Sequence, residues 1–284
     1  MSRIVYVNGE YLPEEQGKVS IFDRGFLFAD GVYEVSAVLQ GRLVDNEAHL
    51  ARLHRSLGEL GIPQPVSDAD IVAAQQQLIE RNDLKEGLVY LQITRGPADR
   101  DFAFPASPEP TLVMFTQVHE LIDPPKARQG LRIKTVEDIR WKRRDIKTVG
   151  LLAPSMAKQA ALDAGADDAW MVEDGYVTEG TSNNAFIVTA DNVIRTRQLS
   201  NLILHGITRA AILRLAGQES ISIEEGAFTP EDAYQAREAF ITSATAFAMP
   251  VVSIDGHRIG DGKPGPVTRR LRELYLDAAL GVGG

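Results

Sequence analysis

A lysine at the end of a basic segment is the residue of this sequence best suited to covalent chemistry. The segment 138–152, DIRWKRRDIKTVGLL, carries five cations, and Lys147 is the last of them before the apolar run VGLLAP. A lysine at the edge of an apolar segment must extend its amine to solvent, find a partner or lose its charge. A neutral lysine amine attacks a carbonyl carbon and forms a Schiff base. Lys147 is therefore our candidate for carbonyl chemistry.

The other cations of this segment have a simpler interpretation. Read with a period of two, the segment predicts a strand with Trp141 and Lys147 on one face and Arg140 and Arg144 on the other. We expect these arginines on a solvated face, paired with acidic neighbours such as Asp138. A nucleic-acid surface is disfavoured, because 39 Asp and Glu residues outnumber 30 Lys and Arg residues and the formal charge is -9.

Three other segments contain groups that bind phosphate. A helix start exposes backbone N–H groups, clustered hydroxyls donate hydrogen bonds, and an arginine can bind an anion through two parallel bonds. Each feature alone is also typical of a helix cap, a turn or a surface ion pair. The residues are Gly206, Ile207 and Thr208 in HGITRAAILRLAG, Thr242, Ser243 and Thr245 in ITSATAF, and Arg52 in HLARLHRSL.

A carboxylate completes this set. Glu179 stands in VTEGTSNNAFIV, followed by Gly180, between two strand-like runs that would also suit a plain hairpin. A carboxylate can pair with a protonated ring nitrogen. A Schiff-base lysine, such a carboxylate and several phosphate ligands are together what pyridoxal 5'-phosphate requires from a protein. The sequence therefore predicts this cofactor.

Composition excludes several other classes of protein and of functional site. The chain has 284 residues, 44% of them hydrophobic, which is enough for one large domain or two modest ones. It has no cysteine, so disulfides and thiolate chemistry are excluded, and we expect a cytoplasmic protein. The five histidines show no metal-ligand spacing, and no apolar run is long enough to span a membrane. We predict no metal site and neither a nucleic-acid nor a membrane partner.

Periodicity and turn signals predict the helices and strands on which these residues stand. We predict a small N-terminal α/β domain over 1–120, an interdomain linker over 121–130 that contains Pro124, Pro125 and Gly130, and a large C-terminal domain over 131–284 that carries Lys147. The expected elements are hairpins at 4–12 and 30–45, helices at 46–62 behind Asn46 as N-cap and at 68–84, strands at 87–96, 111–118 and 131–140, a helix at 153–165, strands around 174–175, a helix at 206–217, a strand at 238–245 and a helix at 266–280.

Seven segments, in order, resemble those of the fold-type IV pyridoxal phosphate enzymes, and among them most closely the D-amino acid aminotransferases. The resemblance covers essentially the whole chain. The segments are DRGFLFADGVYEV (23–35), HLARL (49–53), YLQITRG (90–96), VEDIRWKRRDIKTVGLL (136–152), VTEGTSNNAF (177–186), LILHGITR (202–209) and FITSAT (240–245). The implied fold is an α/β (α+β) protein of two domains, the larger with a barrel-like sheet.

The resemblance also implies roles for single residues. Lys147 would form the Schiff base, Glu179 would keep the ring nitrogen protonated, and Leu204 would pack against the ring. The residues implied for the phosphate are Arg52, Gly206, Ile207, Thr208, Ser243 and Ala244, and those implied for the substrate are Tyr33, Val35, Arg100 and Phe102. Ala244 stands where relatives tend to carry a hydroxyl, and Phe102 where they carry a histidine.

The activity implied is transamination between D-amino acids and 2-oxo acids, of the D-alanine and D-glutamate type, in a homodimer in which the loop 96–105 serves the neighbouring subunit. Because Phe102 makes the pocket more apolar, we also expect side activity on (R)-primary amines. Three alternatives stay open: a branched-chain L-amino acid aminotransferase, 4-amino-4-deoxychorismate lyase and a non-catalytic pyridoxal phosphate carrier.

Overall fold

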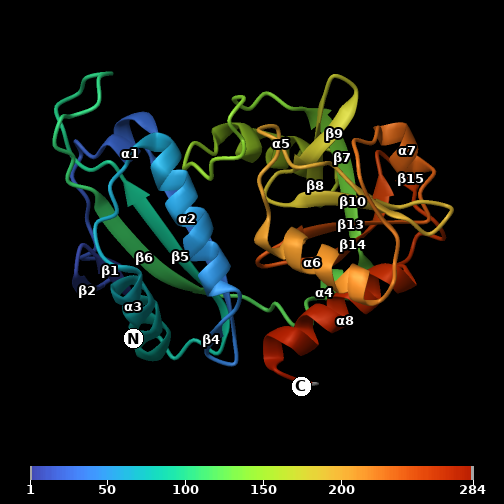
Figure 1. The fold of residues 1–284 in the computed structure, drawn as a ribbon, viewed down its shortest axis with the longest axis horizontal. Helices are drawn as coiled ribbons and strands as arrows, with labels where there is room; N and C mark the ends of the chain where they lie inside the picture. Colours follow the sequence, from blue (N-terminus) through green and yellow to red (C-terminus); the bar gives the residue numbers. More distant parts are fainter. Residues whose placement is uncertain (1, 283–284) are drawn as a thin grey trace. The chain divides into compact units, whose positions relative to one another are not determined.

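Two units divide the chain in the computed structural model, which describes residues 2–282 (Figure 1). The first unit consists of the residues up to Leu121 together with the segment Ile146–Gly150. The second consists of Ile122–Asp145 and the chain from Leu151 onward. Each unit combines helices with one sheet, so the predicted α/β class is confirmed.

The first unit is a six-stranded antiparallel sheet with helices packed against it. Its strands are β1 Ile4–Val7, β2 Glu10–Pro13, β3 Gly31–Leu39, β4 Arg42–Leu43, β5 Glu86–Thr94 and β6 Thr111–Val118, in the order β2-β1-β6-β5-β3-β4. Its helices are α1 Arg24–Phe28, α2 Asn46–Leu60 and α3 Asp68–Arg81. Leu50, Leu53 and Leu57 recur at helical spacing on α2 and join the core.

Both predicted hairpins of this unit are confirmed. The turn between β1 and β2 is Asn8–Gly9 and that between β3 and β4 is Gln40–Gly41, and all four residues have positive φ, as tight hairpin turns require. The predicted N-cap of α2 is wrong by one residue. Asp45 is the cap and Asn46 is the first helical residue, because the Asn46 side chain is held between Ser36 Oγ at 2.8 Å and Gln75 Oε1 at 2.7 Å.

The second unit is built on a nine-stranded mixed sheet. Its strands are β7 Leu131–Glu137, β8 Asp168–Glu173, β9 Tyr176–Gly180, β10 Asn184–Val188, β11 Ile194–Thr196, β12 Ile223–Glu225, β13 Glu238–Ser243, β14 Phe247–Ile254 and β15 His257–Arg258. The order is β12-β11-β10-β13-β14-β7-β8-β9, with β15 paired to β14. The terminal strand β9 also contacts β10, so the sheet curls into a half barrel, as expected.

Five helices of the described chain accompany this sheet, and two of its strands pair through buried aromatic side chains. They are α4 Pro125–Gln129, α5 Leu152–Asp163, α6 Ile207–Gln218, α7 Pro230–Tyr234 and α8 Pro266–Leu280. Phe186 of β10 and Phe240 of β13 face each other in register and stack with ring centroids 4.6 Å apart. These paired strands fix the neighbouring polar positions Asn184 and Thr242, which are also in register.

The basic segment is not the strand that the alternation predicts. β7 ends at Glu137, and the chain bends at Arg140, whose backbone N–H and Nε donate to Asp138 Oδ1 at 3.1 and 2.9 Å in place of strand pairing. Farther along, the chain pairs with β3 instead: Tyr33 N–H donates to Lys147 O at 3.0 Å, and a bridge joins Val32 to Thr148. Lys147 therefore belongs to the first unit, which differs from the predicted 131–284 domain.

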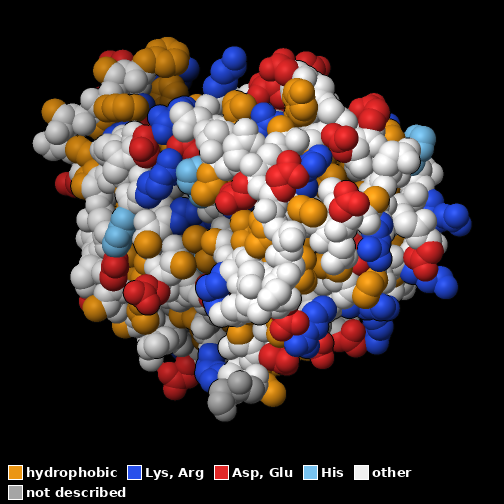
Figure 2. Space-filling model, turned by 45° about the vertical axis from the view of Figure 1, so that its right-hand side comes forward, with side chains coloured by type: hydrophobic (Ala, Val, Ile, Leu, Met, Phe, Trp, Pro, Cys, Tyr) orange, Lys and Arg blue, Asp and Glu red, His pale blue; other side chains and the backbone are white. Residues whose placement is uncertain are grey.

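The predicted linker region also contains regular structure. The division between the units falls at 121/122, and α4 occupies part of 121–130 within the second unit. Within residues 2–282, the helices lack the length and apolar content of a membrane span. Figure 2 shows acidic and basic side chains interspersed over the face that it draws.

Candidate active site

Lys147 is held by the backbone of the first unit, with its amine over an aromatic ring. Its carbonyl accepts from Tyr33 N–H, and its own N–H donates to Ser56 Oγ at 3.4 Å. Its Nζ lies 4.0 Å from the centroid of the Tyr33 ring. Tyr33 and Val35 share one face of β3, because residues two apart in a strand point the same way. The structure thus brings the predicted lysine together with one predicted substrate residue.

Arg52 is buried in the same unit and is oriented by a carboxylate. Its Nε and Nη2 donate to Glu34 Oε1 and Oε2 at 2.7 and 2.8 Å, and His49 Nδ1 lies 2.7 Å from Glu34 Oε2. Burial alone would raise the pKa of Glu34, but Arg52 and His49 outweigh it and lower that pKa to about 2. The bidentate pair fixes the plane of the guanidinium, as an anion-binding arginine requires.

The other two predicted substrate residues lie on an exposed loop. Arg100 extends over the rings of Phe28 and Phe102, at 5.4 and 5.8 Å from their centroids. Phe102 is 80% exposed. Within residues 2–282, neither side chain has a hydrogen bond, ion pair or ring contact with Tyr33 or Lys147. The single chain therefore does not bring all four predicted substrate residues together.

Glu179 lies in the second unit, near the end of β9, and is buried with donors on both carboxylate oxygens. Oε1 accepts from Arg140 Nη1 at 2.6 Å. Oε2 accepts from Asn184 Nδ2 and from the backbone N–H of Leu204, both at 3.0 Å. Burial raises the pKa of Glu179, and the charge and hydrogen bond of Arg140 oppose that rise. This arrangement holds a carboxylate ready for a cationic partner.

Asn184 joins three predicted site residues and was missed by sequence analysis. Besides Glu179, its Nδ2 donates to Leu204 O at 3.0 Å. Its Oδ1 would lie only 2.0 Å from a Cβ added at Gly206, so a side chain at that position would displace the Asn184 amide. The signal in the sequence was a single polar residue opening the apolar run NAFIV, which fixes no contact without the fold.

The predicted phosphate residues of the second unit lie at a helix start and a strand end. Gly206 caps α6 without a side-chain bond, so the first N–H groups of this 12-residue helix have no acceptor within it. Ser243 ends β13, and Ala244 follows in the turn to β14. Thr242 Oγ1 is buried without a hydrogen-bond partner among the described residues. These unsatisfied donors suit an anion, so the residues fit a phosphorylated cofactor.

Arg140 has a different environment from the solvated face that the sequence predicts. Its side chain is 12% exposed, and it donates from Nε and Nη2 to Asp138 at 2.9 and 2.6 Å as well as to Glu179. Arg144 is also buried and binds Glu173 at 2.9 Å. The expected pairing with Asp138 is confirmed, but the exposure is wrong, because the segment folds inward to supply cations to buried carboxylates.

Replacing Arg140 with methionine should move the acid side of the pH–activity profile to higher pH. Burial raises the pKa of Glu179, and the Arg140 cation is the strongest interaction that opposes this rise. Without Arg140, the pKa of Glu179 therefore rises further. If the ionised form of Glu179 supports the reaction, activity is lost as the pH falls through the pKa of Glu179. With a higher pKa, this loss begins at a higher pH. The measurement is kcat/KM against pH, with Arg195→Met, which breaks the Arg195–Glu224 pair, as control. An unchanged acid limb would contradict this role.

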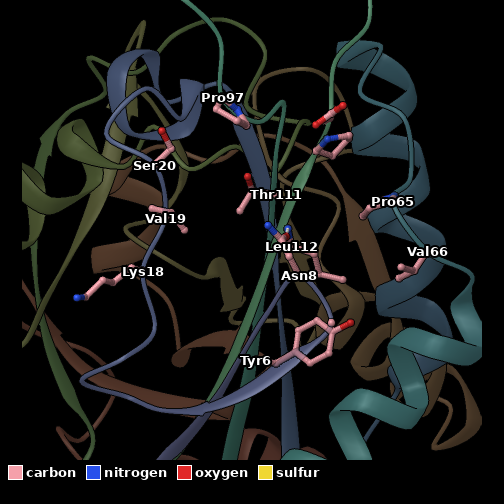
Figure 3. A pocket seen from close by; sticks show the side chains of 13 residues that line it. Tyr6, Asn8, Lys18, Val19, Ser20, Pro65, Val66, Pro97, Thr111 and Leu112 are labelled. Carbon is pink, nitrogen blue, oxygen red and sulfur yellow. Dashed lines mark hydrogen bonds between the residues drawn. The ribbon is translucent and has the colours of Figure 1, made fainter.

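One pocket of about 450 Å³ lies outside these residues, in the first unit (Figure 3). Tyr6, Asn8 and Leu112 line it from β1, its turn and β6, with Lys18 and Pro65 at its sides. It includes none of the predicted site residues. The candidate site is thus defined by side-chain chemistry and not by this cavity.

The sequence and the fold of this chain are similar to those of known aminotransferases. The family model described as "Amino-transferase class IV" matches residues 31–254. A D-alanine aminotransferase of Bacillus licheniformis is 41% identical over 277 residues, covering 97% of each chain, and one of Staphylococcus aureus is 38% identical over 274 residues, covering 95% of this chain and 96% of the relative.

Among solved structures, the branched-chain aminotransferase from the archaeon Thermoproteus uzoniensis, solved with norvaline, superposes with a TM-score of 0.89 at 26% identity, over 100% of this chain and 96% of that one. The matched family segment includes Lys147, Glu179 and the start of α6. On the family match and the near full-length relatives together, this chain belongs to the class IV aminotransferases.

Proposed function

We propose that this protein transfers amino groups between D-amino acids and 2-oxo acids with pyridoxal 5'-phosphate as cofactor. The observation that carries the proposal is the buried Glu179 carboxylate, held by Arg140, Asn184 and Leu204 in a chain 41% identical to a D-alanine aminotransferase. The bound cofactor supplies the electron sink that makes the substrate Cα–H bond acidic. The protein supplies binding, orientation and proton transfer.

Each residue has a role that its environment supports. Lys147 Nζ would carry the cofactor as a Schiff base and, once released, would move the Cα proton of the substrate. Glu179 would keep the ring nitrogen protonated, with Leu204 against the ring. The phosphate would be held by Arg52 and by Gly206, Ile207, Thr208, Ser243 and Ala244, the last through its backbone N–H alone. Tyr33, Val35, Arg100 and Phe102 would bind the substrate.

The branched-chain L-amino acid aminotransferases are the principal alternative, because solved structures of branched-chain enzymes, one of them with pyridoxamine 5'-phosphate, share the fold. Two of them are 27% and 26% identical to this chain, against 41% and 38% for the two D-alanine aminotransferases. D-amino acid specificity is therefore the better proposal.

The test is turnover of purified protein with 2-oxoglutarate and a panel of amino donors. We expect D-alanine to be used and L-leucine, L-isoleucine and L-alanine to give negligible rates. Preference for L-leucine would select the branched-chain alternative. An absorbance spectrum that does not change on adding any amino acid would select the carrier.

We propose that the protein is a homodimer in which the loop 96–105 of one subunit serves the site of the other. In its support, Phe26, Phe102 and Phe104 are exposed together with Ile21 and Phe22, and such apolar surface is typical of a protein interface. Sedimentation equilibrium should give twice the chain mass of 31.1 kDa. A fully active monomer would contradict the proposal.

We also propose a cytoplasmic location, which the absence of cysteine supports. Fractionation of the source cells with an antibody to the protein would test it. Recovery in a secreted fraction would count against it.

Phe102 should weaken, without abolishing, the preference for substrates that carry a carboxylate. A histidine there could donate a hydrogen bond worth about 1–2 kcal/mol, whereas phenylalanine lowers the cost of binding an apolar group. We expect measurable activity on (R)-1-phenylethylamine. In Phe102→His, the ratio of kcat/KM for D-alanine to that for the amine should rise about tenfold. Tyr176→His, which changes an exposed aromatic residue of the second unit, is the control. An unchanged ratio in Phe102→His would refute the role.

A further inference from the structure

A buried arginine binds the backbone of the loop that carries Arg100 and Phe102. Arg24, the first residue of α1, is only 2% exposed. Its Nη1 donates to two backbone carbonyls of the loop, Asp101 O at 2.6 Å and Ala103 O at 3.3 Å. Its Nε donates to Asp30 Oδ2 at 2.8 Å. One guanidinium therefore ties the loop backbone to the body of the first unit.

A second buried arginine makes this anchor rigid. Arg95 binds the same Asp30 carboxylate through Nε and Nη2, at 2.8 and 3.1 Å, and donates to Leu60 O and Gly61 O at the end of α2. Its guanidinium lies 3.7 Å from the centroid of the Phe104 ring, at the far end of the loop. The loop is thus attached at its backbone by Arg24 and at Phe104 by Arg95.

Arg100 extends from this loop backbone, and its contacts are with aromatic rings. Its guanidinium lies over Phe28 and Phe102, and the Phe28 ring also has Arg24 4.6 Å from its centroid. Within residues 2–282, Arg100 forms no ion pair or hydrogen bond, so its charge remains available to an anion. The direction in which it extends depends on the loop backbone and on Phe28, and Arg24 contacts both.

We infer that Arg24 is a positioning residue that fixes the loop conformation in which Arg100 meets the substrate carboxylate. The inference rests on the proposed function, which assigns Arg100 that role. Lysine cannot replace the arginine here, because a single ammonium cannot donate in a planar fork to Asp30 and to the loop carbonyls at once. It would still carry the charge that faces Asp30, so Arg24→Lys should keep the fold and free the loop.

The experiment compares holoenzymes of the wild type, Arg24→Lys, Arg100→Ala and the double variant. In Arg24→Lys we expect the KM for D-alanine to rise about 10- to 100-fold while kcat at saturation changes by less than about threefold, because misplaced Arg100 weakens binding of ground and transition states alike. In the Arg100→Ala background, Arg24→Lys should add nothing, since both changes remove the same contact.

A second readout does not depend on activity. Amide hydrogen exchange over residues 101–103, followed by mass spectrometry, should be about tenfold faster in Arg24→Lys than in the wild type, because the 101–103 backbone is no longer held. The matched control is Arg3→Lys, since Arg3 also binds a carboxylate and a backbone carbonyl, those of Glu14 and Thr116.

The outcomes separate the inference from the proposed function. No turnover of D-alanine by the wild type would refute the proposed function, and the exchange rates would still report on the loop. An unchanged KM in Arg100→Ala would instead overturn the inference, because Arg100 would then not meet the substrate carboxylate. Unchanged hydrogen exchange over residues 101–103 in Arg24→Lys overturns the inference. When Arg100→Ala itself raises the KM, an unchanged KM in Arg24→Lys also overturns the inference. Under the same condition, the inference is overturned if Arg24→Lys raises the KM equally in the Arg100→Ala background and in the wild type.

Discussion

Replacing Lys147 with alanine is expected to lower transamination by a factor on the order of 10³ or more while leaving the fold intact. The amine that would carry the cofactor and move the substrate proton is lost. The contacts that fasten residue 147 use its backbone, N–H to Ser56 and carbonyl to Tyr33, and alanine keeps both. The side chain gives up only its position over the Tyr33 ring, worth about 0.5–1 kcal/mol.

Lys142 and Lys158 provide the controls for this variant. Lys142 is exposed in the same basic segment, and Lys158 Nζ is bound to Asp167 O at 2.6 Å. Alanine at either position should leave kcat within about twofold of the wild type. Circular dichroism and thermal unfolding should be close to wild type in all three variants. Substantial activity in Lys147→Ala would remove this residue from the mechanism.

Replacing Glu179 with glutamine should lower kcat by about 10²–10³ while the cofactor dissociation constant changes by less than about tenfold. Glutamine has one acceptor oxygen, so it cannot accept from both Arg140 on one side and Asn184 with Leu204 on the other. It also carries no charge to keep the ring nitrogen protonated. The phosphate contacts, which supply much of the anchoring, are left in place.

The measurements are single-turnover rates with D-alanine and a cofactor titration followed by absorbance. Glu173→Gln is a suitable control, because Glu173 is a partly exposed carboxylate of the same unit that binds Arg144. Equal rates in Glu179→Gln and the wild type would exclude a role for the carboxylate. A large loss of affinity with unchanged kcat would assign it to binding alone.

Much of the fold could be predicted because the local patterns and the final packing agree. The hairpins at Asn8–Gly9 and Gln40–Gly41 carry turn residues that tolerate positive φ, and α2 and α3 have apolar residues at helical spacing. The expected strands 87–96 and 111–118 appear as β5 and β6. In these segments, short-range sequence preferences are enough to specify the structure.

The strand predicted for the basic segment 138–152 was wrong because the structure of this segment depends on partners distant in the sequence. Alternation of apolar and charged residues predicts a strand, but Asp138 and Glu179 draw Arg140 inward, and β3 pairs with the backbone around Lys147. Paired burial of opposite charges is not visible in a local pattern. For the same reason the sequence did not reveal Asn184, whose two bonds join residues 5 and 20 positions away.

The roles of the predicted site residues depended on the family resemblance and not on spacing. Lys147 and Arg52 stand in the first unit, and Glu179 and the start of α6 in the second, so no local motif contains them together. What the structure adds is the partner of each: Glu34 for Arg52, Arg140 for Glu179, and Arg24 for the loop of Arg100.

Chemical trapping would show which lysine holds pyridoxal 5'-phosphate. The purified protein, loaded with cofactor, is reduced with borohydride, digested and mapped by mass spectrometry. We expect a pyridoxyl group on Lys147, and its disappearance when D-alanine is added before reduction. A pyridoxyl group on another lysine, or none on a protein that turns over D-alanine, would contradict this expectation.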